Sequence, residues 1–251
     1  MSRFRISLFI MADRYFLEKV IDSDHATLEG AEAHHLLHVM RAKPGVEVVL
    51  FDGSGAEFEA RVEKCGRSSV ELAVLSRTVI DRELPFELIF GVALPKGDRQ
   101  KWLVEKLTEL GVTALAPIET RRGVAQPFES ALDRLRKSVI EASKQCGRNR
   151  LMRIDAPQTV DHFALHADST MPRWIAHPGG DGVAKHLDEI RGQAMECKSI
   201  SVLVGPEGGF TSEEAAAAVS AGWRQIDLGT RILRVETAAI AIAATVAAVI
   251  R

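Results

Sequence analysis

Residues 47–76 show apolar and polar side chains that alternate with a period of two, which is the pattern of half-buried β-strands. Three segments carry this pattern, EVVLFD, AEFEARVE and SVELAVLS, and turn sequences rich in Gly, Asp and Ser separate them. Short antiparallel strands joined by tight turns predict a small β-barrel. Before them, residues 31–41 (AEAHHLLHVMR) predict one helix with Leu36, Leu37 and Met40 facing inward.

Beyond residue 84 the pattern changes to apolar runs of strand length that alternate with segments of helical period. The strand-like runs are FELIFGVAL, VTALAPI, RWIAH, SISVLVG and RQIDLG, and helices are expected over residues 97–111 and 130–147, after Thr211 and after Glu236. This alternation predicts a parallel sheet covered by helices on both faces. We therefore expect an α/β fold in two domains, with a barrel over residues 1–83 and the parallel sheet over residues 84–251. Within the first domain, residues 1–10 are expected to form a poorly ordered extension.

Composition narrows the class of protein. Apolar residues make up 46% of the 251 residues and charged residues 26%, with a net charge of −2, which is ordinary for a globular protein. The three cysteines lie far apart without CxxC spacing, which argues against a disulfide framework or a zinc site. Because no apolar run reaches the ~18 residues of a membrane helix, we expect a cytoplasmic protein without a membrane partner.

The segment SVLVGPEGGFTSEE (residues 201–214) has more glycine than a simple strand-to-helix connection requires. Glycine permits positive φ angles and lets a ligand approach the main chain. Thr211 and Glu214 have the spacing of a capping box at the start of the next helix. The loop lacks the Lys-Ser/Thr of a phosphate-binding P-loop, and no GxGxxG opens a helix. We therefore predict a ligand that is held by main-chain groups and not by its phosphates.

Two further segments are expected at strand ends of the same sheet, where open α/β sheets bind ligands. IAHPGG (residues 175–180) places Pro-Gly-Gly after a strand, and LGTRILRVETAAIAI (residues 228–242) leads into an alanine-rich helix. The alanines fit simple burial, but Arg231 and Arg234 stand in an otherwise apolar loop. Together the three loops predict one ligand site.

Residues 121–153 contain nine Lys or Arg against three acidic residues. On the helix of this segment, an apolar face is expected to oppose a basic face formed by Arg134, Lys137, Lys144 and Arg148. A solvated helix face explains these charges equally well. The irregular GRNR at its end is better suited to phosphate binding, with Asn149 reading a base edge or a ribose hydroxyl.

Six motifs, in order, resemble the RsmE family of the SPOUT class of RNA methyltransferases: RYFL, HLLHVMRAKPGVEVVLFDG, KGDRQKWLVEKLTELGV, EASKQCGRNR, LVGPEGGF and LGTRILRVETAA. The resemblance runs from about Arg14 to the end of the chain. It implies a PUA-like barrel followed by a parallel sheet with a C-terminal trefoil knot, in a homodimer that buries the knot. It also implies methyl transfer from S-adenosylmethionine to N3 of a uridine in 16S ribosomal RNA, near the decoding region of the small subunit.

The resemblance also implies the residues of the site. Those expected to contact the cofactor are His177, Pro178, Leu203, Val204, Gly205, Pro206, Glu207, Gly208, Gly209, Leu228, Gly229, Ile232, Leu233, Thr237 and Ala238. Arg14 and Arg41 match family positions that face RNA. With residues of the basic segment, the expected RNA contacts are Arg14, Arg41, Arg121, Arg122, Lys144, Arg148, Asn149 and Arg150.

Uridine N3 becomes nucleophilic only after it loses its imide proton, so the site must stabilise an anion. A cation would do this, and Arg234 or an arginine of GRNR is a candidate. Glu236 or Glu207 could accept the proton, although either could instead cap a helix or hold a loop; we favour a structural role for Glu207. The candidate catalytic residues are Arg234, Glu236 and Asn149, and no metal is required.

Other interpretations remain open at this point. A non-catalytic RNA-binding or ribosome-assembly module explains the barrel and the basic segment, but such a protein has no reason to keep three cofactor loops. A methyltransferase of another RNA, or of a small metabolite, would keep the loops. His34 and His38 lie four residues apart, but HExxH is absent, so we interpret them as surface or RNA-proximal residues.

Overall fold

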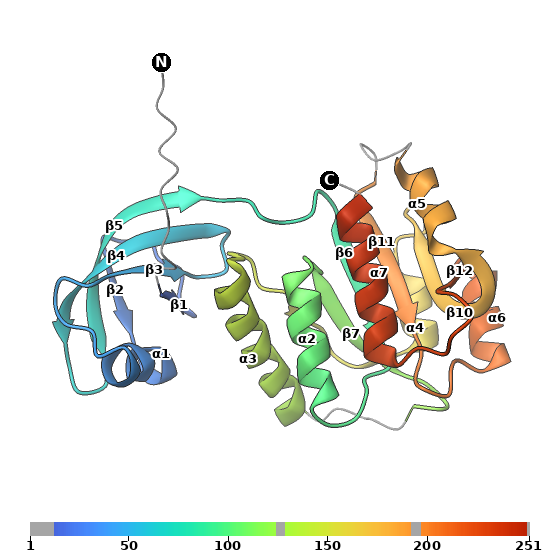
Figure 1. Cartoon of the computed structure of the whole chain (residues 1–251), viewed down its shortest axis with the longest axis horizontal. Helices are drawn as coiled ribbons and strands as arrows, with labels where there is room; N and C mark the ends of the chain where they lie inside the picture. Colours follow the sequence, from blue (N-terminus) through green and yellow to red (C-terminus); the bar gives the residue numbers. More distant parts are fainter. Residues whose placement is uncertain (1–12, 124–128, 192–196, 250–251) are drawn as a thin grey trace, which may run out of the picture. The chain divides into compact units, whose positions relative to one another are not determined.

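The computed structural model describes residues 13–123, 129–191 and 197–249. The expected extension, residues 1–10, lies outside the described residues. The fold is mixed α/β and divides into two compact units (Figure 1). Among the described residues, those up to Asp81 form the first unit together with Gly147–Arg150, and the others form the second. The sequence pattern assigned those four residues, 147–150, to the second domain.

The first unit is a curled five-stranded sheet with strand order β1-β3-β4-β5-β2. Its elements are β1 (Arg14–Phe16), β2 (His25–Leu28), α1 (Gly30–His34), a π-helical turn η1 (His35–Val39), β3 (Glu47–Phe51), β4 (Ala56–Cys65) and β5 (Val70–Val79). β1 and β3 pair in parallel, and the other pairs are antiparallel. Every second residue from Ala56 to Val62 is buried, which confirms the period-two prediction for this strand.

The helix expected over residues 31–41 is interrupted. Met40 N–H donates to the carbonyl of His35, an i→i+5 bond that widens the turn. The wider turn rotates later side chains out of the helical face, so Leu36 is buried but Met40 is 45% exposed. Leu37 is half-buried, and Arg41, at φ 54°, ends the segment in the left-handed region. The prediction that Met40 faces inward was therefore wrong.

The second unit is a parallel sheet with strand order β12-β10-β11-β6-β7-β8, and a short strand β9 pairs with β7. Its strands are β6 (Glu87–Val92), β7 (Ala114–Glu119), β8 (Arg153–Ile154), β9 (Gln158–Thr159), β10 (Arg173–Gly182), β11 (Ser199–Val204) and β12 (Arg224–Asp227). Its helices are α2 (Arg99–Glu109), α3 (Glu129–Cys146), α4 (Val160–His166), α5 (Val183–Arg191), α6 (Ser212–Ser220) and α7 (Val235–Val249). The predicted parallel sheet is confirmed. The helices α4 and α5 were not predicted from the sequence pattern.

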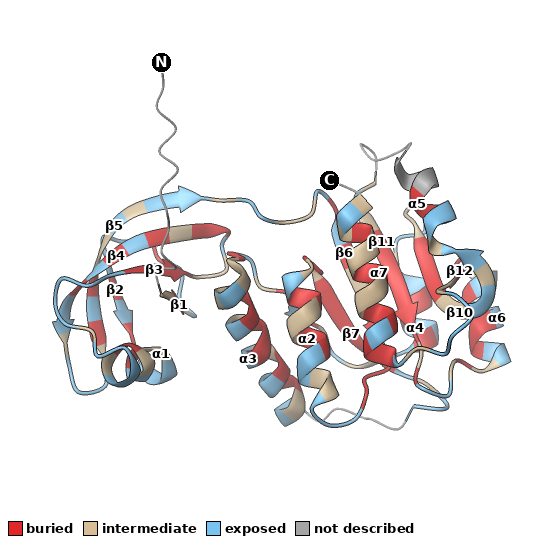
Figure 2. Cartoon of the chain, in the orientation of Figure 1, coloured by how far each residue is buried: buried red, intermediate tan, exposed pale blue. Residues whose placement is uncertain are grey.

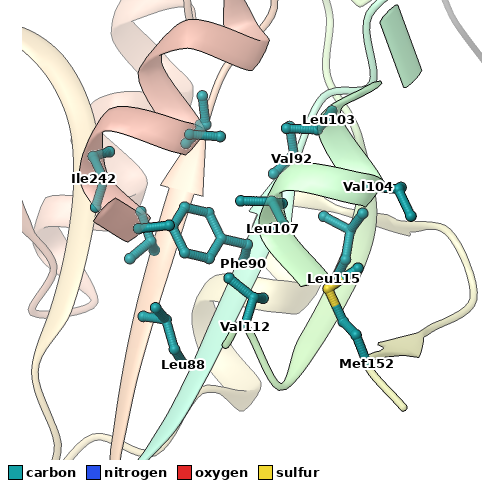
Figure 3. Close-up of a cluster of buried hydrophobic side chains, with 14 of the residues drawn as sticks. Leu88, Phe90, Val92, Leu103, Val104, Leu107, Val112, Leu115, Met152 and Ile242 are labelled. Carbon is teal, nitrogen blue, oxygen red and sulfur yellow. The ribbon is translucent and has the colours of Figure 1, made fainter. Parts of the chain in front are cut away.

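Two apolar layers enclose this sheet, as the buried residues in Figure 2 show. On one face, Phe90 of β6 packs with Leu107 of α2 and Ile242 of α7, as seen in Figure 3. On the other face, Leu203 of β11 packs with residues of α4 and α6. Ala239 and Ala243 of α7 are fully buried, so the alanines of this helix allow close packing against the sheet.

Candidate functional site

The strand order of the second unit reverses direction between β11 and β6. β6 and β11 are neighbours, with Val92 paired to Val204. After β6 the chain passes to α2 on one face, whereas after β11 it passes to α6 on the other. Because the two connections diverge, a crevice is expected between them, as at the switch points of other parallel sheets.

The glycine-rich loop after β11 makes a tight turn in which Gly209 N–H donates to the carbonyl of Pro206 at 2.8 Å. Gly209 has φ 68° and open space around it, so its main chain is accessible to a ligand. Gly205 has a different role, because an added Cβ would lie 3.0 Å from the Phe210 ring. Leu203 and Val204 are buried in the two core layers, so only their main chain is available. The predicted capping box of Thr211 and Glu214 is confirmed.

Arg121 and Arg122 lie beside this loop. Arg122 Nη1 donates to the carbonyl of Gly208 at 2.8 Å, and Arg121 N–H donates to Glu214 Oε1 at 2.8 Å. Arg121 also forms an ion pair with Glu213. Both arginines, expected to bind RNA, thus hold the glycine-rich loop and the start of α6.

The segment HPGG does not follow the end of a strand, although the sequence predicted that it would. β10 continues to Gly182, and residues 177–180 bulge out, since Ala176 and Asp181 both pair with Ile226. Gly180 permits this bulge, because an added Cβ would lie 2.5 Å from the main chain of Gln225. His177 is half-buried and Pro178 is exposed.

Asp227, the last residue of β12, joins two of the predicted loops. Its Oδ2 accepts from Gly179 N–H at 2.9 Å, and its Oδ1 accepts from Gly229 N–H at 2.7 Å. These two main-chain hydrogen bonds lower the pKa of the Asp227 carboxyl. Sequence reasoning missed this residue, for which the signal was an acidic side chain at a strand end, two residues before a glycine.

The third loop presents an exposed rim and a buried end. Arg231 and Arg234 are exposed, and the side chain of Ile232 is 97% exposed, so in this conformation it lies in solvent rather than in a cofactor pocket. Leu228 and Leu233 pack partly against the core. Where α7 begins, Thr237 is exposed and Ala238 is buried.

Glu236 is the buried carboxylate of this site, with 4% of its surface exposed. It pairs with Arg99 Nη1 at 3.5 Å, and Arg99 Nη2 pairs with Glu207 at 3.0 Å. Arg99 belongs to the motif KGDRQKW but was not among the predicted site residues. It links the connection after β6 to those after β11 and β12.

Gly147–Arg150 belong to the first unit, and Arg148 and Asn149 are 4% and 2% exposed. Asn149 Oδ1 accepts from Arg14 at 2.5 Å, and its Nδ2 donates to the carbonyl of Ile80 at 3.4 Å. Arg14 is also paired with Glu57 at 2.8 Å. The expected basic helix face must be corrected, because α3 ends at Cys146 and Arg148 is buried beyond it.

The remaining expected RNA contacts differ in their accessibility. Arg41 and Arg150 are exposed. Lys144 has 15% of its side chain exposed and pairs with Glu141 at 3.2 Å. The rings of His34 and His38 lie 4.8 Å apart. In the described part of the chain, no three His, Cys, Asp or Glu residues group as metal ligands would.

Comparisons with known proteins agree with this arrangement. Residues 82–247 match the family model of an RNA methyltransferase domain, and residues 28–75 match an RNA methyltransferase PUA domain. A relative from Synechocystis sp., named ribosomal RNA small subunit methyltransferase E, is 30% identical over 92% of this chain and 76% of its own. The chain belongs to the RsmE family. The RsmE protein of Bacillus subtilis is 27% identical over 90% of this chain and 92% of its own.

Solved structures extend the RsmE comparison to the fold. The RsmE protein of Neisseria gonorrhoeae bound to S-adenosylmethionine has a TM-score of 0.82 at 29% identity, covering 93% of this chain and 96% of that one. A methyltransferase structure from Legionella pneumophila with bound S-adenosylmethionine has a TM-score of 0.85 at 26% identity, covering 94% and 97%. None of the helices in the described ranges has the length and apolar character to span a membrane.

Proposed function

We propose that this chain transfers a methyl group from S-adenosylmethionine to N3 of a uridine in 16S ribosomal RNA. Membership of the RsmE family and the cofactor-bound relatives support the reaction class. The observation that carries the proposal is the open main chain of Gly209 in the same loop as Glu207, which pairs with the Arg99 that also pairs with the buried Glu236. The uridine target and its position near the decoding region are inferred from membership of the family.

The residues present fit this cofactor. S-adenosylmethionine carries a sulfonium, an ammonium group, a carboxylate and ribose hydroxyls but no phosphate, so its site needs acceptors for the cationic groups and no lysine cradle. Carboxylates of Glu207 and Glu236 supply negative charge, and Oε2 of Glu236 makes no hydrogen bond to any described residue. We propose that the expected cofactor contacts act mainly through main-chain groups, since Leu203 and Val204 point into the core. When bound, the cofactor supplies an electrophilic methyl group.

The chain's own residues would then prepare the base. Arg234, on the exposed rim, would stabilise the uracil anion, and Glu236 would accept the N3 proton. Holding the base in line with the methyl group accounts for about 7–11 kcal/mol of barrier lowering in well-oriented reactions. Asn149 stays a third candidate, although its hydrogen bonds within the first unit favour a structural role.

We further infer that the RNA is bound within the small subunit by the expected arginines, of which Arg41, Arg121, Arg122 and Arg150 are exposed. A cytoplasmic location follows from that substrate. We also propose the family's trefoil knot and homodimer. The dimer is supported by Ile232, an apolar side chain whose 97% exposure would be relieved against a second copy.

The test uses the purified full chain, labelled S-adenosylmethionine and two substrates, 30S subunits and naked 16S RNA. We expect N3-methyluridine at a single position by mass mapping of the digested RNA. Calorimetry on the same protein should detect binding of the cofactor. Absence of cofactor binding would refute the proposal, whereas cofactor binding with methylation of another RNA would refute only the substrate.

A further inference from the structure

Arg99 occupies a position in its helix that local electrostatics disfavour. It is the first residue of α2, and the amino end of a helix carries a partial positive charge that repels a cation. Its side chain is 35% exposed and reaches out of the helix to two carboxylates, Glu207 at 3.0 Å and Glu236 at 3.5 Å. These partners, and not the helix, account for an arginine at this position.

The two carboxylates belong to different loops of the site. Glu207 lies in the glycine-rich loop after β11, and Glu236 lies in the first turn of α7. A planar guanidinium offers donors in a fixed fork, so it can hold two carboxylates at a set separation, which a lysine ammonium does not. Arg99 thereby fixes the two loops relative to each other and to the connection that follows β6.

Glu236 depends on this contact. Its side chain is 6% exposed, against 41% for Glu207, and a carboxylate so deeply buried is costly without a compensating charge. Arg99 is the cation paired with it among the described residues. One oxygen, Oε1, contacts Arg99, while the buried Oε2 makes no hydrogen bond to any described residue.

We propose that Arg99 is a positioning residue of methyl transfer: it holds Glu236 in place for the reacting base and, through Glu207, fixes the glycine-rich loop for the cofactor. This inference rests on the proposed function. The two arms make separate predictions. Loss of the ion pair with Glu207 should weaken cofactor binding. Loss of the ion pair with Glu236 should slow the chemical step.

The experiment measures cofactor Kd and the single-turnover rate of RNA methylation for Arg99→Gln, Glu207→Gln, Glu236→Gln and the double variant Arg99→Gln/Glu236→Gln. Displacing a reacting group by ~1 Å can cost 100-fold, so we expect Arg99→Gln to lower the rate roughly 10- to 100-fold. The double variant should be no slower than Glu236→Gln alone, because Arg99 acts through Glu236. Glu207→Gln should raise Kd with little effect on the rate. Arg99→Lys should restore part of the rate.

Lys101→Gln is the matched control, since it removes a cation from the same helix that pairs with Glu105 at 3.7 Å. It should leave Kd and rate unchanged, and circular dichroism checks that all variants fold. A wild type that binds cofactor but methylates no RNA would refute the proposed function. Additive losses in the double variant, or an Arg99→Gln rate equal to wild type, would refute the positioning role while leaving that function intact. If Arg99→Gln fails to fold, the cofactor Kd and the single-turnover rate of Arg99→Lys and Glu207→Gln test the positioning role instead.

Discussion

Replacing Asn149 with alanine should destabilise the first unit and leave the second unaffected. Asn149 is buried, and its Oδ1 accepts from the Arg14 guanidinium, which is itself only 14% exposed. A hydrogen bond to a charged group contributes about 1.5–3 kcal/mol, and a longer neutral bond such as that to Ile80 contributes about 0.5–1 kcal/mol. We therefore expect Asn149→Ala to lower the free energy of unfolding of the first unit by about 2–4 kcal/mol.

The chain provides separate reporters for its two units. Trp102, Trp174 and Trp223 all lie in the second unit, whereas the single tyrosine, Tyr15, is fully buried in the first. Urea unfolding is followed by tryptophan fluorescence and by the NMR signal of fluorotyrosine at residue 15. With about 2 kcal/mol per molar of urea for a unit of this size, the Tyr15 midpoint should fall by about 1–2 M.

The same experiment separates a structural from a catalytic Asn149. Lys137→Gln, on the exposed side of α3, serves as a control that should move neither midpoint. An unchanged Tyr15 midpoint combined with lost methylation would refute the structural reasoning and place Asn149 in the chemistry. A lowered midpoint with normal single-turnover methylation at low temperature would remove it from the candidate catalytic residues.

The remaining predictions concern the loops of the second unit. Asp227→Asn should raise the Kd of S-adenosylmethionine by calorimetry, because it weakens the acceptor for both glycine amides. Since the folded pKa of Asp227 is lowered, its contribution is full above the ordinary carboxyl pKa and is lost as pH falls through the lowered value, so the wild-type advantage should disappear in acid. Gly180→Ala should cost about 1–3 kcal/mol and weaken cofactor binding, whereas Gly182→Ala, with nothing within 4 Å of the added Cβ, should do neither. Ile232→Asp should convert a dimer to monomer in light scattering, with less than about 0.5 kcal/mol effect on monomer stability.

The strands and main helices could be predicted because their periods follow from backbone geometry. Alternation over β4 and the helical period over α3 need no knowledge of the partner element. The bulge at residues 177–180 could not be found in this way, because it exists only through the pairing of β10 with β12. The π-helical turn at His35 could not be predicted for a related reason, because a single i→i+5 hydrogen bond does not change the composition of the segment.

The sequence predicted the parts of the site in which the residue type by itself indicates the role. Excess glycine marked the loop after β11, although Gly205 turned out to serve the packing of Phe210. Asp227 and Arg99 act by joining loops that lie far apart in the chain, and an isolated charged residue gives no sign of such partners. The roles of these two residues follow from tertiary contacts and not from the local sequence.

Counting charges overstates the basic surface of residues 121–153. Arg122 is bonded to the main chain of the glycine-rich loop, Arg136 is paired with two acids of its own helix, and Arg148 is buried in the first unit. Arg134, Lys137 and Arg150 remain exposed, with no ion pair among the described residues. Binding to RNA phosphates depends on cations that can release counterions, so the effective charge of this segment is well below its formal excess. The exposed residues Arg134, Lys137 and Arg150 are therefore better candidates for RNA contact than the whole segment.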